Sequence, residues 1–184
     1  AVSPAALAHF FNNMMLEEMA TDTYYTMIYA DLDHTTGRLR MVQAGHPHPV
    51  LQRADGTVLP LGNGGMPIGV FENPIFDEID VILEPGDRLL ICSDGLTGEV
   101  DDASIERMLR RPTDVRTIAE DLVRRALDGG GHDNISVVIV EAVEVLGQPG
   151  ASEDTAGGTS PAEDEFEVDE DTLPRPLADG EGRA

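Results

Sequence analysis

The stretch that decides the fold reads DRLLICSDGLTGE and spans residues 87–99. A Pro-Gly turn precedes it, and the apolar run at residues 89–92 predicts a short buried strand. The run stops at Asp94 and Gly95, so a carboxylate lies where the backbone leaves the core. Such a position suits a metal ligand, but an aspartate before a glycine also commonly hydrogen-bonds its own turn. Both interpretations of Asp94 stay open at this point.

A second carboxylate has a related setting. Asp133 follows three glycines and His132, and it precedes an apolar run at residues 135–140 that predicts another strand. If the two strands pair in antiparallel fashion, Asp94 and Asp133 come to the same rim of a sheet. Two hard oxygen ligands on one rim suit Mg²⁺ or Mn²⁺ better than zinc.

Charge and length narrow the class of protein. The 184 residues include 35 acidic and 12 basic ones, with a net charge of −23. We therefore expect no binding to nucleic acid or to anionic membranes, because no basic surface is available. No apolar run is long enough to span a membrane, and no secretory signal is visible. The one cysteine, Cys92, cannot form an intramolecular disulfide, which favours a reducing, cytoplasmic location and a role as a small core residue.

The chain divides into two parts of different composition. Helix and strand patterns fill residues 1–146, which we expect to form one domain with its own core. Residues 147–184 hold eleven acidic and two basic residues among many Pro, Gly, Ser and Thr. This composition predicts a disordered acidic tail over residues 147–184.

Periodicity and turn sequences predict the individual elements. Ser3 and Pro4 are typical of a helix start, and the glycines after Asp128 are typical of a helix end. We expect helices over residues 4–19, 103–110 and 113–127, and strands over residues 24–32, 38–44, 50–53, 57–61, 76–83, 89–92 and 135–145.

Three other motifs do not support a site of their own. Asp31 and Asp33 resemble the start of a calcium loop, but the glycine and glutamate that an EF-hand needs are missing. His46 and His48 each precede a proline and have no third Cys or His nearby, which favours a rigid turn over a transition-metal site. The glycine-rich segment 62–69 lacks the Lys-Ser/Thr ending of a P-loop and predicts a tight crossing loop.

Six short motifs come in order along the chain: YTMIYADLD (25–33), GRL (37–39), AGHPHP (44–49), GMPIG (65–69), PGD with SDGLT (85–97) and DNIS (133–136). In this order and spacing they resemble the metal-dependent protein phosphatases (PPM, type 2C), in the bacterial SpoIIE-like branch that includes stress-response phosphatases. The resemblance covers roughly residues 3–140.

The resemblance implies an α+β fold, a two-layer antiparallel β-sandwich flanked by helices, with a binuclear Mn²⁺ or Mg²⁺ centre at one rim. Asp94 and Asp133 match metal ligands of the family, and we expect Gly95 and Asn134 to lie beside that centre. No catalytic side chain beyond the ligands is implied, because the nucleophile would be a metal-bound water.

The chain departs from the family in one important respect. The family's opening strands carry a Gly-Asp motif that supplies further metal ligands, and no such segment precedes the helix at Ser3-Pro4. We therefore expect the chain to begin after those strands. In addition, Gly98 separates Thr97 from Glu99, where many relatives have Thr-Glu directly.

The expected function is hydrolysis of phosphoserine or phosphothreonine in a bacterial regulatory protein. The resemblance implies substrates such as phosphorylated anti-sigma-factor antagonists, and sensor or response-regulator domains fused upstream. A haloacid-dehalogenase-type phosphatase does not fit, because Cys92 occupies the position of its nucleophilic aspartate. A different class stays open: a non-catalytic, partner-binding module built on the same fold.

Overall fold

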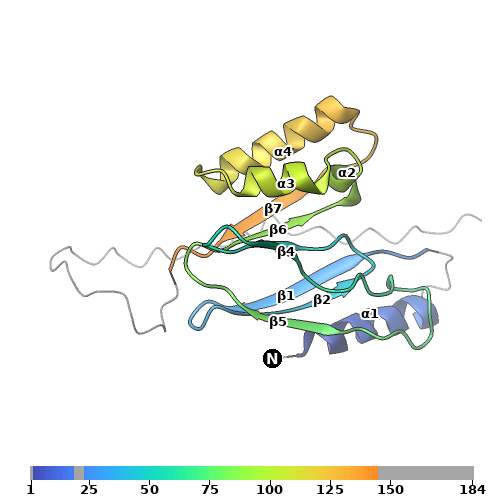
Figure 1. Ribbon diagram of the computed structural model, residues 1–184. Helices are drawn as coiled ribbons and strands as arrows, with labels where there is room; N and C mark the ends of the chain where they lie inside the picture. Colours follow the sequence, from blue (N-terminus) through green and yellow to red (C-terminus); the bar gives the residue numbers. More distant parts are fainter. Residues whose placement is uncertain (1, 19–22, 145–184) are drawn as a thin grey trace, which may run out of the picture. The chain divides into compact units, whose positions relative to one another are not determined.

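The computed structural model describes residues 2–18 and 23–144, whose seven strands form two antiparallel sheets (Figure 1). The first sheet has the order β1-β2-β5 and the second the order β4-β3-β6-β7. The strands are β1 (Met27–Asp33), β2 (Arg38–Ala44), β3 (Val50–Gln52), β4 (Val58–Pro60), β5 (Glu78–Ile82), β6 (Arg88–Cys92) and β7 (Val137–Glu141).

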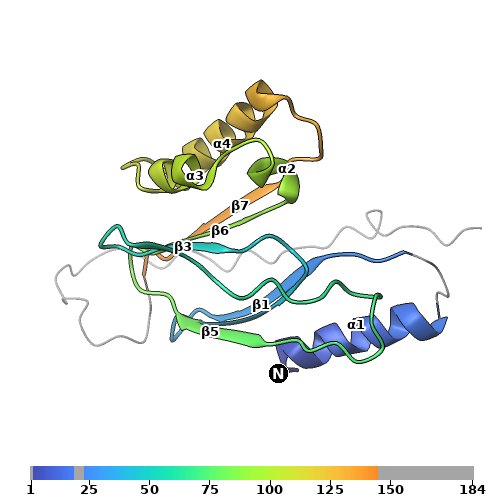
Figure 2. The ribbon, with the colours of Figure 1, turned by 45° about the vertical axis from the view of Figure 1, so that its right-hand side comes forward.

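Helices cover the outer faces of both sheets. In Figures 1 and 2, α1 (Pro4–Glu18) lies along the first sheet, while α3 (Asp102–Leu109) and α4 (Val115–Gly129) lie over the second. A short helix, α2 (Asp94–Thr97), follows β6 directly. The arrangement confirms the expected two-layer antiparallel β-sandwich flanked by helices.

Strand β6 is buried on both faces, which explains its uninterrupted apolar run. Leu89 packs between the sheets with Leu39 and Met41 of β2. Its neighbour Leu90 points the other way, into a core shared with Ile118 of α4. Because successive side chains of a strand alternate between its faces, such a central strand needs apolar residues at every position.

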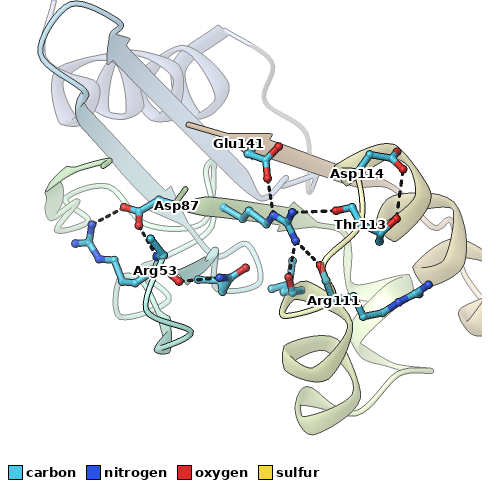
Figure 3. Close-up of polar contacts among 10 residues, drawn as sticks. Arg53, Asp87, Arg111, Thr113, Asp114 and Glu141 are labelled. Carbon is cyan, nitrogen blue, oxygen red and sulfur yellow. Dashed lines mark hydrogen bonds and ion pairs between the residues drawn. The ribbon is translucent and has the colours of Figure 1, made fainter. Parts of the chain in front are cut away.

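Two charged residues at the start of β6 tie the second sheet to its surroundings. The side chain of Asp87 is 1% exposed. Its carboxylate accepts hydrogen bonds from Arg53 Nη1 at 2.7 Å, the Glu84 backbone N–H at 2.9 Å and the Ala54 backbone N–H at 3.1 Å (Figure 3). A buried carboxylate is stable there because each of these donors points at it.

The guanidinium of Arg88 joins β6 to β7 and to the loop between α3 and α4. Its Nε donates to Glu141 Oε1 at 2.7 Å. Its two terminal nitrogens donate to the backbone carbonyls of Leu109, Arg111 and Thr113 at 2.8–2.9 Å (Figure 3). Leu109 lies in the last turn of α3, where helix geometry leaves its carbonyl without an internal partner, and the other two carbonyls belong to the loop that follows. Arg88 therefore caps α3 from the sheet.

Several predicted boundaries were wrong by a few residues. Strand β1 begins at Met27 because Tyr25 makes an isolated bridge to Ile68 instead of joining the sheet. Strand β7 is shorter than expected and begins at Val137, because Ser136 bonds to the turn after β6. Helix α4 continues to Gly129, and Gly130 adopts a positive φ of 142° as its cap. Helix α2 was not expected.

The described residues lie within one compact unit, residues 1–149. The proposed tail over residues 147–184 lies outside the described residues, so the boundary at residue 146 stays a prediction. No helix among the described residues has both the length and the hydropathy of a membrane span.

Candidate metal centre

The end of β6 and the segment before β7 are bonded side by side. Strands β6 and β7 pair antiparallel, with Cys92 opposite Val137, which is the condition for Asp94 and Asp133 to share a rim. Beyond this pair, the Ser93 N–H donates to the Ser136 carbonyl at 3.0 Å. The Ser93 hydroxyl donates to the Asn134 carbonyl at 2.7 Å and accepts from the Ser136 N–H at 2.8 Å. Ser93 therefore holds the segment that carries Asp133 against the turn that carries Asp94.

Gly95 brings the two backbones into direct contact. A Cβ atom at this position would lie 2.5 Å from the Asn134 carbonyl oxygen and 2.9 Å from its carbon. Only a residue without a side chain fits such an approach. The four residues predicted to surround the site, Asp94, Gly95, Asp133 and Asn134, thus lie together at one rim of the second sheet.

The two carboxylates differ in their local bonding. Asp133 Oδ1 accepts a hydrogen bond from the backbone N–H of Asn134 at 2.7 Å. The hydrogen bonds found at Asp94 among the described residues use its backbone carbonyl, which accepts from Gly98 N and Thr97 Oγ1. The interpretation of Asp94 as an aspartate that bonds its own turn through its carboxylate therefore finds no support in this geometry.

His46 lies near the same rim, two residues after the end of β2. Its Nδ1 is 3.1 Å from the Thr26 hydroxyl oxygen, and the backbone of Cys92 and the charge of Asp94 are close enough to act on its pKa. Burial lowers the pKa of His46 below its usual value, while the Cys92 carbonyl and the charge of Asp94 act in the opposite direction. This neighbour of Asp94 was not predicted, because the contact depends on how the two sheets stack.

His48 takes a different direction from His46. Its Nδ1 lies 3.0 Å from the Leu61 carbonyl, as expected for an imidazole that stabilises a rigid turn. The two histidines therefore do not converge on a shared ligand position. The aspartates that resemble a calcium loop are also engaged elsewhere, since Asp31 pairs with Arg40 and Asp33 accepts from Thr35.

A second unpredicted contact supports the Asp133 loop. Glu99 Oε1 and His132 Nδ1 are 2.7 Å apart, and this hydrogen bond holds the pKa of the Glu99 carboxyl below its usual value. The Glu99 side chain also packs against Gly129 at the end of α4. Glu99 therefore joins the loop after α2 to the loop before β7, next to Asp133.

Cys92 takes no part in such a site. It is 4% exposed and packs in the core with Leu90 and Leu96. Burial raises the pKa of its thiol to about 11, so the reactive thiolate is scarce at neutral pH. Its expected role as a small core residue fits this environment.

The two carboxylates are ligands of the type that a hard divalent cation prefers, but they are fewer than such a cation needs. Asp94 and Asp133 offer carboxylate oxygens, the ligands that Mg²⁺ and Mn²⁺ prefer. Within residues 2–18 and 23–144, no group of three or more His, Cys, Asp or Glu is placed to hold a metal ion. The described residues therefore supply part of a ligand set, and two carboxylates alone would bind such a cation weakly.

Known proteins share both the sequence pattern and the fold. Residues 1–143 match the family described as Stage II sporulation protein E (SpoIIE). The serine/threonine protein phosphatase PstP of Mycobacterium tuberculosis is 46% identical over 59 residues, which are 32% of this chain and 11% of PstP. This chain thus spans about a tenth of that relative.

Two solved structures show the same fold at low sequence identity. The phosphatase domain of SpoIIE from Bacillus subtilis superimposes with a TM-score of 0.58 at 20% identity, covering 77% of this chain and 66% of that one. The catalytic domain of PstP, solved with two manganese ions, gives a TM-score of 0.61 at 24% identity, covering 75% and 69%. The chain therefore belongs to the SpoIIE family and has the fold of the metal-dependent protein phosphatases (PPM).

Proposed function

We propose that this chain supplies two metal ligands, Asp94 and Asp133, to a Mn²⁺- or Mg²⁺-dependent protein serine/threonine phosphatase. The observation that carries the proposal is the backbone contact at Gly95, which holds both carboxylate loops at one rim. Relatives of the chain are named serine/threonine protein phosphatases, and one was solved with two manganese ions. When bound, such ions would activate a water molecule and neutralise the phosphoryl oxygens.

Apart from the two ligands, the residues of this chain would act by holding the ligand loops in place. Ser93 and Gly95 fix the separation of the two loops, and Asn134 lies beside them. His46, whose ring pairs with the Thr26 hydroxyl, lies close enough to Asp94 for the charge of that carboxylate to act on its pKa. We propose a phosphoserine or phosphothreonine protein as substrate, with a phosphorylated anti-sigma-factor antagonist as one example, and a cytoplasmic site of action.

A non-catalytic, partner-binding role is the second candidate. The observation in its favour is that the described residues group fewer than three metal-binding side chains. A domain with too few ligands would keep the fold and a binding surface but would not hydrolyse phosphate esters.

Calorimetric titration of the chain with Mn²⁺, together with hydrolysis of a phosphothreonine peptide, separates these candidates. Asp94→Asn and Asp133→Asn are the test variants. Asp128→Asn is the matched control, because Asp128 is an exposed aspartate on α4 and the change in charge is the same. The control matters because a chain with net charge −23 attracts divalent cations non-specifically.

The expected result is Mn²⁺ binding that weakens in both test variants and persists in the control. Equal binding by all three variants would overturn the assignment of Asp94 and Asp133. Site-dependent binding without turnover would favour the partner-binding candidate for this chain.

A further inference from the structure

A cavity of about 520 Å³ opens on the helix-covered side of the second sheet. Its apolar walls come from Val50 of β3, Val58 of β4 and Ile105 of α3, and Cys92 lines it from β6. Helix α3 covers β6, so the cavity lies where β3 and β4 extend past the helix. Its volume is in the range of sites that bind small organic molecules.

Both charged side chains that line this cavity are carboxylates. Asp102 and Glu106 are four residues apart on α3 and both line the cavity, as expected for one face of a helix. Glu106 pairs with Arg110 at 3.1 Å. Asp102 is exposed and takes part in none of the ion pairs formed by the described residues.

His48 also lines the cavity, and its hydrogen bond to the backbone leaves one ring nitrogen free to accept another. Its Nδ1 must donate to reach the Leu61 carbonyl at 3.0 Å. In the uncharged ring, Nε2 is then the acceptor. An apolar cavity with a free carboxylate and an imidazole acceptor is complementary to a cation with an apolar body, and it disfavours anions.

We propose that this cavity binds a small organic ammonium compound with an aromatic or aliphatic body. The body would lie on Val50, Val58 and Ile105, and the ammonium group would face Asp102. The complex is non-covalent, because the Cys92 thiol stays protonated at neutral pH. The cavity adjoins the candidate metal rim, because Thr97, in the same short helix as Asp94, also lines it. The inference rests on the lining of the cavity and needs no bound metal.

The chain has no tryptophan, so indole compounds can serve as fluorescent probes without background. Three probes share one ring and differ in charge: tryptamine is a cation, tryptophol is neutral and indole-3-propionate is an anion. We expect tryptamine to show increased anisotropy on titration and to bind about two- to fivefold more tightly than tryptophol, the usual effect of an exposed ion pair. Indole-3-propionate should bind most weakly.

Two variants test whether the ammonium group binds at Asp102. Asp102→Asn should remove the preference for tryptamine over tryptophol, while Glu120→Gln, an equal charge change at an exposed position of α4, should keep it. Measurements in about 0.15 M salt screen the overall negative charge. If both variants lose the preference equally, the cation is held by net charge alone and the proposal is wrong.

Two further measurements test the apolar part of the cavity. Val58→Phe, at a half-buried wall position, should weaken binding of all three probes, with circular dichroism as a check on folding. In the unchanged chain at about pH 9, where a primary ammonium with a pKa of about 10 is still mostly charged, tryptamine should slow the alkylation of Cys92 by iodoacetamide, because both would occupy the same space. An alkylation rate unaffected by saturating tryptamine would place the probe elsewhere and refute the proposal.

Discussion

Replacement of Arg88 should strongly lower the free energy of unfolding, although this side chain lies at the edge of the core. The Arg88 side chain is 14% exposed and makes four hydrogen bonds, one to Glu141 and three to backbone carbonyls at the end of α3 and in the loop after it. Deleting a hydrogen bond that involves a charged group typically costs about 1.5–3 kcal/mol. The four bonds share one guanidinium, so their losses do not add. We expect Arg88→Met, which keeps an apolar stem, to lower the free energy of unfolding by about 3–4 kcal/mol.

A sharper test separates the stability that comes from the Glu141 ion pair from the stability that comes from the three carbonyl contacts. Glu141 is 29% exposed, so its ion pair with Arg88 is partly screened by water. Glu141→Gln should therefore cost less than about 1 kcal/mol. Arg88→Lys should cost about 1.5–3 kcal/mol, because one ammonium group cannot reproduce the planar fork that reaches three carbonyls.

Urea unfolding followed by far-ultraviolet circular dichroism provides the measurement, since the chain has no tryptophan. The midpoint should fall while the m-value stays constant, as for a change in stability alone. If Arg88→Met cost less than about 1 kcal/mol, or no more than Glu141→Gln, the carbonyl contacts would not stabilise α3 as described.

Three further predictions concern the turns next to β6 and the helices that cover the second sheet. Gly95→Ala should destabilise the protein by about 1–3 kcal/mol and weaken Mn²⁺ binding, because the new methyl meets the Asn134 backbone; calorimetry giving unchanged binding would contradict the close approach. Asp87→Ala should cost about 3–5 kcal/mol in urea unfolding, because it leaves Arg53 and two backbone donors without their acceptor; a loss below 1 kcal/mol would show that water replaces the carboxylate. Asp101 and Asp114 accept hydrogen bonds at the starts of α3 and α4, which lowers the pKa of both carboxyls. Their stabilisation is complete above the unfolded pKa of about 4 and is lost as the pH falls through the lower folded values, so replacing both with alanine should flatten the acid limb of a stability–pH curve.

Much of the sandwich could be predicted from local patterns. The β6 run is apolar at every position because one face packs between the sheets and the other under the helices. The amphipathic pattern of α4 placed Ile118 and Leu122 in the core, where both are fully buried. Helix α2 was missed because it is a single turn, and its Asp-Gly start is also typical of a loop.

Only the part of the candidate site that depends on the pairing of two strands was predicted from the sequence. The sequence offered two apolar runs, at residues 89–92 and 135–140, and their antiparallel pairing as β6 and β7 brings the Asp94 and Asp133 loops together. The contact of His46 with the end of β6 could not be predicted, because it joins residues of different sheets. The hydrogen bond between Glu99 and His132 likewise depends on how two loops fold over each other.

The backbone contact at Gly95 has a mechanical consequence. Main-chain atoms of the two loops touch there, and Ser93 bonds them on both sides, so the loops should move as one body with the end of β7. Any shift of the second sheet would then displace the two carboxylates together and leave their separation nearly constant. The distance that can change at this rim is the one between that pair and the first sheet, near whose end His46 lies.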